Sequence, residues 1–165
     1  MLKQFFDSDV IVRFDNAKSE TSIYFDDTIC KPSFTLDSEK MLEFNSLLDK
    51  YFEWNKKATE KGVKIEKEIG RFTTNCYFKY GDEWYGPSTA EVVLTFFSRS
   101  ENQHELVVEI TKLYSPTNNY ITCAPSAQYF IFKSVKILRK FNSIDFIQKK
   151  VKENDKQKSI ESEFK

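Results

Sequence analysis

Residues that carry acid-base, nucleophilic or metal chemistry are few and scattered in this sequence of 165 residues. His104 is the only histidine, which excludes a metal site built from two or more histidines. It follows Asn102 and Gln103 in a polar segment, and no Gly-x-Ser-x-Gly segment supplies a nucleophile to pair with it. We therefore expect His104 to be a solvated turn histidine.

Paired carboxylates are the second arrangement that can catalyse a reaction, because one acts as the general acid and the other as base or nucleophile. Glu66 and Glu68 share one face of a predicted strand and are flanked by Lys64 and Lys67. Two adjacent acidic pairs lie elsewhere in the sequence: Asp26 with Asp27, and Asp82 with Glu83. Acids interleaved with lysines are typical of a solvated strand face with cross-strand ion pairs, so we expect no catalytic role for them.

Cofactor and metal signatures are missing as well. The sequence has only 4 glycines and contains neither a Walker loop nor a Gly-x-Gly-x-x-Gly segment, so it offers no phosphate-binding loop. Cys30, Cys76 and Cys123 are odd in number and widely spaced, which gives neither a Cys-x-x-Cys metal motif nor a closed set of disulfides. We expect reduced, buried thiols, no cofactor, no metal and a protein that is not an enzyme.

The composition is that of one folded domain. Hydrophobic residues make up 40% and charged residues 30%, so we expect residues 1–152 to form a single α+β domain and residues 153–165 to form a charged, frayed tail. The formal net charge is 0, so no overall field attracts the chain to nucleic acid or to an anionic membrane. Because no secretory signal and no membrane-spanning apolar run is found, the sequence predicts a cytoplasmic protein without a membrane partner.

The strongest structural signal predicts a long amphipathic helix over residues 38–61. Asp37 is placed to cap its N-terminus, lysines fill its last turn, and Gly62 suits the residue after its end. Apolar residues recur at steps of three and four positions: Met41, Phe44, Leu48, Tyr51 and Phe52. These signals agree on one buried helix face.

Alternation of apolar and polar residues predicts antiparallel strands on both sides of this helix. The segments with this period are 10–25, which we interpret as an opening hairpin, then 33–36, 63–80, 90–97 and 106–110. We expect residues 81–87 to form a loop that carries Trp84 and Tyr85, and residues 98–104 to form a polar turn. Residues 129–141 are interpreted as a strand that gives way to a helix, and Ser143 as the cap of a short C-terminal helix. The predicted fold is an antiparallel sheet packed on the long helix and a C-terminal helix, in the α+β class.

With catalysis excluded, we expect a binding protein that acts through a protein-protein interface, such as an inhibitor, an immunity-type protein or a small subunit of a larger assembly. Trp84 and Tyr85, next to Asp82 and Glu83, combine large rings with an acidic rim, as interface hot spots do. Trp54, on the polar side of the predicted helix, extends this hypothetical patch.

The alternative is a single-stranded nucleic-acid-binding protein, because aromatic rings on a sheet stack on bases while nearby cations contact phosphates. The basic residues in question are Lys133, Lys136, Arg139 and Lys140 near the C-terminus, with Arg71, Lys79 and Arg99 on or near strands that carry Tyr77 and Phe97. The order of strands, helix, strands and helix resembles, in topology, the Whirly-type single-strand binders, which are built from two sheet-plus-helix units. No residue motif of that family is present, so the resemblance assigns no site residue.

Overall fold

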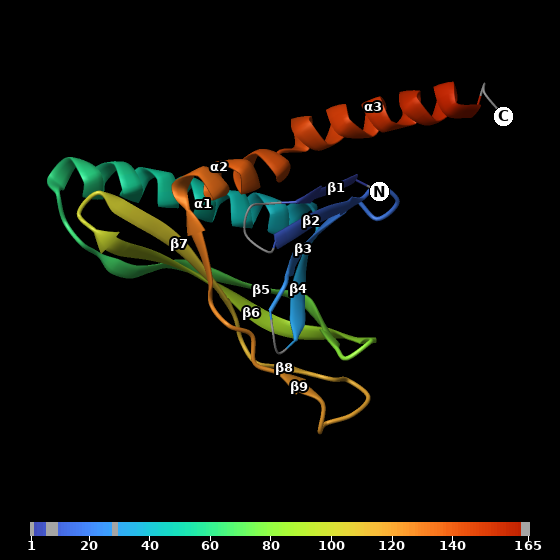
Figure 1. Cartoon of the computed structure of the whole chain (residues 1–165), viewed down its shortest axis with the longest axis horizontal. Coiled ribbons are helices and arrows are strands. Elements are labelled where there is room, and N and C mark those ends of the chain that lie inside the picture. Colours follow the sequence, from blue (N-terminus) through green and yellow to red (C-terminus); the bar gives the residue numbers. More distant parts are fainter. Residues whose placement is uncertain (1, 6–9, 28–29, 163–165) are drawn as a thin grey trace.

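The computed structural model describes residues 2–5, 10–27 and 30–162, and within them the chain forms one large antiparallel sheet, a small hairpin and three helices. Figure 1 shows α1 lying across the sheet, α2 beside α1, and α3 pointing away from both. The strands are β1 (Leu2–Phe5), β2 (Val10–Asp15), β3 (Glu20–Phe25), β4 (Lys31–Leu36), β5 (Glu66–Tyr80), β6 (Glu83–Ser100), β7 (Gln103–Ile110), β8 (Leu113–Tyr114), β9 (Thr122–Cys123) and β10 (Gln128–Ile131). The helices are α1 (Ser38–Lys61), α2 (Phe132–Phe141) and α3 (Ile144–Ser162). The predicted α+β class with an antiparallel sheet is confirmed.

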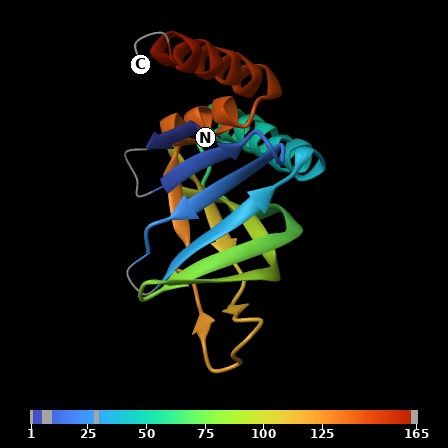
Figure 2. The ribbon, with the colours of Figure 1, turned by 90° about the vertical axis from the view of Figure 1, so that its right-hand side faces the viewer.

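The sheet has eight strands in the order β1-β2-β3-β4-β5-β6-β7-β10, and every pair in it is antiparallel. Because β4 pairs directly with β5, the strands on either side of α1 belong to one continuous sheet. The topological resemblance implies two separate sheet-plus-helix units, and the structure differs from that arrangement at this strand pair. The helices lie together at one side of the curled sheet (Figure 2).

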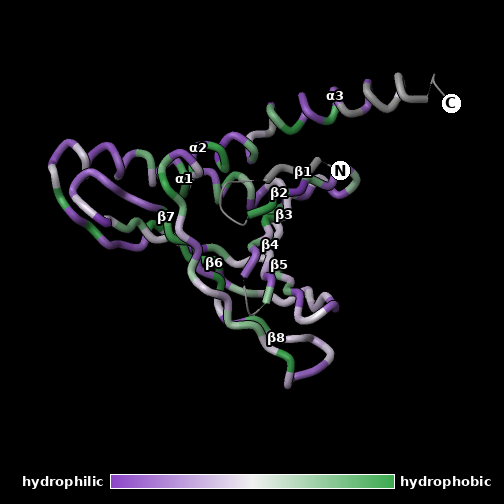
Figure 3. The backbone as a smooth tube through the Cα atoms, viewed as in Figure 1, coloured by the Kyte–Doolittle hydropathy of each residue, from purple (hydrophilic) through white to green (hydrophobic). Residues whose placement is uncertain are grey.

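Helix α1 begins and ends where the sequence predicts. The Asp37 carboxylate accepts a hydrogen bond from the Lys40 backbone N–H, and Gly62 adopts a left-handed conformation with φ of 60° that closes the last turn. Hydrophobic and hydrophilic residues alternate along α1 (Figure 3). Its buried apolar side chains pack on the inner face of the sheet, where α1 contacts β4, β5, β6 and β7.

Aromatic side chains fill the space between α1 and the sheet. Phe34 on β4 is fully buried, with its ring centroid 5.8 Å from that of Phe44 on α1 and 5.9 Å from those of Phe25 and Phe72. Phe25 also lies 6.3 Å from Phe130 on β10, so strands near opposite edges of the sheet approach each other through their rings. The sheet therefore curls around its own apolar face.

The hairpin of β5 and β6 is longer and tighter than the sequence predicts. Gly81 and Asp82 form a two-residue turn, with Gly81 at a φ of 62°, and β6 begins at Glu83. The predicted loop over residues 81–87 is therefore wrong beyond this turn, since Trp84 and Tyr85 lie on a strand. Gly86 marks a shift in register, and an added Cβ there would lie 2.7 Å from the Tyr77 ring.

The C-terminal third follows the prediction at its start and then departs from it. Strand β10 gives way to α2 at Phe132, and the Ser143 hydroxyl accepts a hydrogen bond from the Phe146 N–H at the start of α3. Helix α3 continues to Ser162, whereas residues 153–165 are predicted to be a frayed tail. Within the described residues, no helix has the length and apolar character needed to cross a bilayer.

A disulfide joins Cys30, just before β4, to Cys123 on β9, with the two Cα atoms 6.0 Å apart. The prediction of reduced thiols is therefore wrong for these two residues, and only Cys76 among the described cysteines is free and buried. Burial raises the pKa of the Cys76 thiol to about 12, which keeps it protonated and unreactive. The disulfide ties the β8–β9 hairpin to the main sheet, and the Ser126 N–H reinforces this link by donating a hydrogen bond to the Asp27 carboxylate.

Candidate functional site

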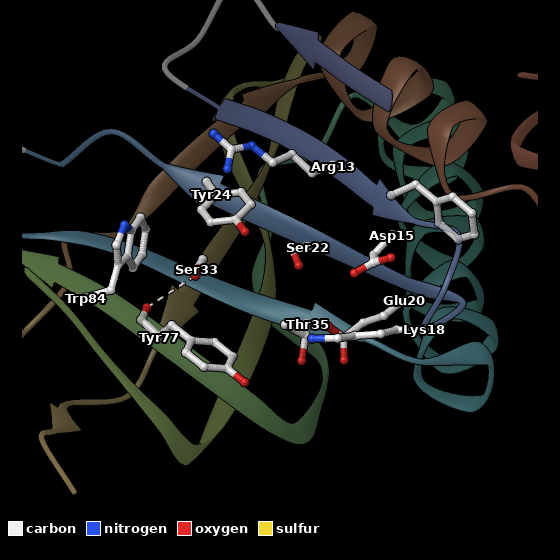
Figure 4. A pocket seen from close by; sticks show the side chains of 11 residues that line it. Arg13, Asp15, Lys18, Glu20, Ser22, Tyr24, Ser33, Thr35, Tyr77 and Trp84 are labelled. Carbon is white, nitrogen blue, oxygen red and sulfur yellow. Dashed lines mark hydrogen bonds between the residues drawn. The ribbon is translucent and has the colours of Figure 1, made fainter. Parts of the chain in front are cut away.

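A groove of about 340 Å³ crosses β2, β3, β4, β5 and the start of β6 on the face of the sheet that points away from α1 (Figure 4). Apart from Phe14 and Lys18, its lining residues alternate along the strands with residues of the buried face such as Val12, Ile23 and Phe34. The alternation that builds the core therefore also builds this outer surface.

Small hydroxyl side chains form the floor of the groove. Ser22 lies directly opposite Thr35, and Ser33 is the neighbour of both Tyr24 and Tyr77 in the strand register. Ser33 and Thr35 are only 1% and 5% exposed, and their hydroxyls donate hydrogen bonds to the carbonyl oxygens of Tyr77 and Asn75. Because these side chains are short and already hydrogen-bonded, the surface is hollow between the larger residues around them.

Aromatic rings line one end of the groove. Trp84 on β6 is 50% exposed, and its ring meets that of Tyr24 on β3 edge to face at a centroid distance of 5.7 Å. Tyr77 on β5 completes this end (Figure 4). Ring surfaces held beside a hollow provide large contact areas at low cost in side-chain entropy, which is why such residues dominate interface energetics.

Arg13 on β2 supplies the positive charge at the same end. Its guanidinium carbon lies 4.6 Å from the centroid of the Tyr24 ring, within the range of a cation-π contact. Its Nε is buried and has no hydrogen-bond partner, and Arg13 makes no ion pair with any residue that the structure describes. Among the described residues, the Arg13 charge is therefore not neutralised by a carboxylate.

Carboxylates lie at the other end of the groove. Asp15 and Glu20 are directly opposite each other in the register of β2 and β3, and both line the groove. Like charges in this position repel each other, and Lys18 in the connecting turn is the one cation beside them among the groove-lining residues. The groove as a whole carries Arg13 and Lys18 against Asp15 and Glu20, so its charges balance.

The residues predicted to form the protein interface do not share one surface. Trp84 faces the groove, whereas Tyr85 stacks on buried Phe78 at 5.4 Å and donates a hydrogen bond to Glu83. Asp82 lies in the adjacent turn and pairs with Lys79 at 3.6 Å.

Trp54 lies far from this turn. It packs on Phe96 at 6.1 Å, with Lys50 and Lys67 above its ring. Trp84 and Phe96 stand twelve positions apart on β6, which is about 40 Å along the strand. Trp84 and Trp54 therefore belong to different ends of the β5–β6 hairpin.

The residues of the nucleic-acid alternative are likewise divided. Lys133, Lys136, Arg139 and Lys140 lie on α2, beside α1, whereas Tyr77 lines the groove and Phe97 contacts Tyr129 on β10. Most of the cations also have carboxylate partners. The ion pairs are Arg71 with Glu68 and Glu91, Lys79 with Asp82, Arg99 with Glu105, and Arg139 with Asp49.

Sequence reasoning missed the groove residues on β2, β3 and β4. Arg13, Tyr24, Ser33 and Thr35 occupy the polar positions of segments whose apolar positions were recognised as core. The signal that identifies them is the pairing of β2 with β3 and of β3 with β4, which places these positions on one face.

His104 is buried, so its assignment as a solvated turn residue is wrong. Strands β6 and β7 extend through most of the predicted turn, and His104 is 3% exposed and stacks on Phe96 at 5.2 Å. Its Nδ1 lies 2.8 Å from the Ser98 hydroxyl, which also accepts a hydrogen bond from the Ile65 N–H. The tautomer of His104 sets whether Ser98 donates to Nδ1 or accepts from it, and Nε2 has no hydrogen-bond partner among the described residues. Within the part of the chain that the structure describes, no acid hydrogen-bonds to this imidazole, and burial of His104 closes the pair to a substrate.

Burial lowers the pKa of His104 below its ordinary value of 6.5, and a hydrogen bond with the Glu101 backbone opposes this effect. Because the unfolded chain binds the proton more readily, the free energy of unfolding should fall as the pH drops below about 6.5, by at most about 1.4 kcal/mol per pH unit. Urea denaturation of the wild type and of His104→Gln at several pH values measures this contribution. The variant should lose the slope that belongs to His104, and equal slopes in both proteins would contradict the burial argument.

The described residues contain no cluster of three or more His, Cys, Asp or Glu side chains arranged to hold a metal ion. Comparison of the chain with protein-family models, with curated proteins and with solved structures found no match. The geometry of the chain itself is therefore the basis for assigning a function.

Proposed function

We propose that this chain is a non-enzymatic binding protein that holds a protein partner in the groove on the outer face of β2 to β6. The observation that carries the proposal is the grouping of Trp84, Tyr24, Tyr77 and Arg13 around a hollow of about 340 Å³. Tryptophan, tyrosine and arginine are the residues most enriched at interface hot spots, and a concave centre lets a partner side chain become fully desolvated. An inhibitor, an immunity-type protein or a small subunit of a larger assembly would use such a surface.

The charge distribution supports a protein partner over single-stranded nucleic acid. A nucleic acid needs unpaired cations along its path, because the release of counterions from phosphates supplies much of the affinity. Here the groove has balanced charges, and Arg71, Arg99 and Arg139 are paired with carboxylates. Binding of nucleic acid to the aromatic end of the groove is the competing outcome of the experiment below.

The disulfide bears on the cellular compartment in which the protein is found. The sequence predicts a cytoplasmic protein, whereas disulfides persist mainly in oxidising compartments. The bond between Cys30 and Cys123 therefore supports an oxidising compartment. Alkylation of thiols in intact cells of the native host, before lysis, shows whether this bond is formed in the cell, because only reduced cysteines react. Alkylated Cys30 and Cys123 would favour the cytoplasm, and protected ones an oxidising compartment.

Trp84→Ala should weaken binding of the protein partner by about 30-fold or more, which corresponds to about 2 kcal/mol. The partner is obtained by affinity capture from the native host with and without nuclease treatment, and is then purified so that the dissociation constant can be measured by calorimetry. The fold should survive, because Trp84 is half exposed and its ring packs on Tyr24, which lies on the outer face of the sheet and not in the core.

Tyr120→Ala is the matched control, because this ring is 97% exposed and lies outside the groove. Equal affinities of the wild type and Trp84→Ala for the purified partner would refute the groove as the interface. Capture that depends on nucleic acid, together with steeply salt-dependent binding of an oligothymidylate that is lost in Trp84→Ala, would establish the competing function instead.

A further inference from the structure

The two ends of the groove carry opposite charges. At neither end do the other groove-lining side chains neutralise the charge fully. Arg13 lies over Tyr24 at the aromatic end without an ion pair among the described residues. Asp15 and Glu20 face each other at the far end, where Lys18 offsets one of the two negative charges. A ligand that supplies an anion at the first end and a cation at the second would relieve both imbalances.

We infer that the groove selects an extended peptide segment of the partner in which an acidic and a basic side chain stand four positions apart and point to the same side. This inference rests on the proposed function and names the chemistry of the partner. The acidic group would pair with Arg13, the basic group would lie between Asp15 and Glu20, and the residues between them would pack on the rings and the hydroxyl floor (Figure 4).

The spacing follows from the strands that build the groove. Tyr24, which lies beneath the Arg13 guanidinium, and Glu20 are four positions apart on β3 and have side chains on the same face. This separation is about 13 Å at ~3.3 Å per residue. An extended peptide has the same rise and the same alternation, so its residues i and i+4 reach the two ends together.

The floor also fits an extended chain. Ser33 and Thr35 are 1% and 5% exposed and their hydroxyls already donate to carbonyl oxygens of β5, so these short side chains form a low, hydrogen-bonded floor on which an extended backbone can lie. Because these two hydroxyls have no donor left, a nucleic-acid phosphate, which is an acceptor, would gain nothing from them.

The experiment uses the full chain labelled with ¹⁵N, because its 2 tryptophans give two indole N–H signals. The signal of Trp84 reports on the groove, the signal of Trp54 serves as an internal control, and Trp84→Phe assigns the two. The probes are the peptide acetyl-Glu-Ser-Phe-Ser-Lys-amide and two peptides with glutamine in place of either the acidic or the basic residue. The peptide with both charges should shift the Trp84 signal and bind about fivefold more tightly than either neutralised peptide, since one exposed ion pair contributes about 1 kcal/mol.

Variants that remove one charge show which side chain of the groove recognises the acidic residue of the peptide and which recognises the basic residue. Arg13→Gln should bind the peptide with both charges and the peptide that lacks the glutamate equally well, and should still prefer lysine over glutamine. Glu20→Gln should still prefer glutamate over glutamine, and should no longer distinguish lysine from glutamine. Arg71→Gln and Glu109→Gln, which remove exposed charges outside the groove, should keep both preferences. Equal affinities for the three peptides, no shift of the Trp84 signal, or unchanged preferences in Arg13→Gln would each overturn the inference. If the peptide experiment fails while Trp84→Ala still weakens binding of the purified partner, the proposed function stands and only the charge pattern is wrong.

Discussion

Phe34→Ala should lower the free energy of unfolding by about 4 kcal/mol, within the range measured for the truncation of buried phenylalanines. The ring is 0% exposed and is surrounded by Phe25, Phe44 and Phe72 at centroid distances of 5.8 to 5.9 Å. Its removal takes away ring contacts to two strands and to α1 at once. Because rigid strands and the long helix hold these neighbours, the cavity is expected to collapse only partly. Urea denaturation followed by circular dichroism measures the loss.

Phe34→Leu is the control, because leucine keeps most of the buried apolar volume. It should cost less than half as much as Phe34→Ala. A further control is Thr73→Ala on the outer face of β5, which should change the free energy of unfolding by no more than about 0.5 kcal/mol. A loss below about 1.5 kcal/mol for Phe34→Ala would show that the aromatic cluster does not hold α1 against the sheet.

The helix α1 was predictable because its signals are local and point the same way. The cap at Asp37, the glycine after its end and the apolar period all lie within residues 37–62, and the structure reproduces each of them. The passage from β10 to α2 was predictable for the same reason, since the period changes within a few residues. The sequence pattern was sufficient to predict a helix or a strand wherever the residues of that element alone define its ends.

The errors arose where distant residues decide the local structure. The polarity of residues 98–104 indicates a turn, but β5 and β10 flank β6 and β7 and keep most of that segment in the sheet. His104 is buried because Phe96 stacks on it and Ser98 hydrogen-bonds to it across the β6–β7 pair. The glycine and proline at 86 and 87 suggest the end of a loop, whereas the structure places them at an irregularity inside a strand.

The candidate site was only partly predictable. The sequence assigns Trp84 and Tyr77 to two separate hypotheses, because nothing in it shows that the two rings line the same groove. The partners that complete the groove, Arg13 and Tyr24, stand more than fifty positions earlier in the chain. Arg13 and Tyr24 come to lie beside Tyr77 and Trp84 only because β4 pairs with β5, although α1 separates these two strands in the sequence. Long-range register is therefore the information that the sequence pattern lacks.

Removal of the disulfide by the double substitution Cys30→Ser and Cys123→Ser should lower the free energy of unfolding by about 4 kcal/mol. The two cysteines are 93 positions apart, and a cross-link that closes a loop of this length removes much of the entropy of the unfolded chain. Guanidinium denaturation of the wild type with and without a dithiol reductant, and of the double variant, measures the effect.

The reduced wild type should match the double variant, and the reductant should leave the double variant unchanged. This comparison separates the effect of the cross-link from the packing of the two sulfur atoms, because reduction keeps both sulfurs in the core.

The local loss of stability should be largest for the β8–β9 hairpin, since Cys123 lies on β9 and the short β8–β9 pair is separate from the main sheet. Hydrogen exchange should therefore show the amides of residues 113–126 opening first in the reduced protein. Equal stability of the oxidised and reduced wild type would mean that the cross-link does not constrain the unfolded chain, and protection of the hairpin would then have to come from the Asp27 contact with the Ser126 N–H.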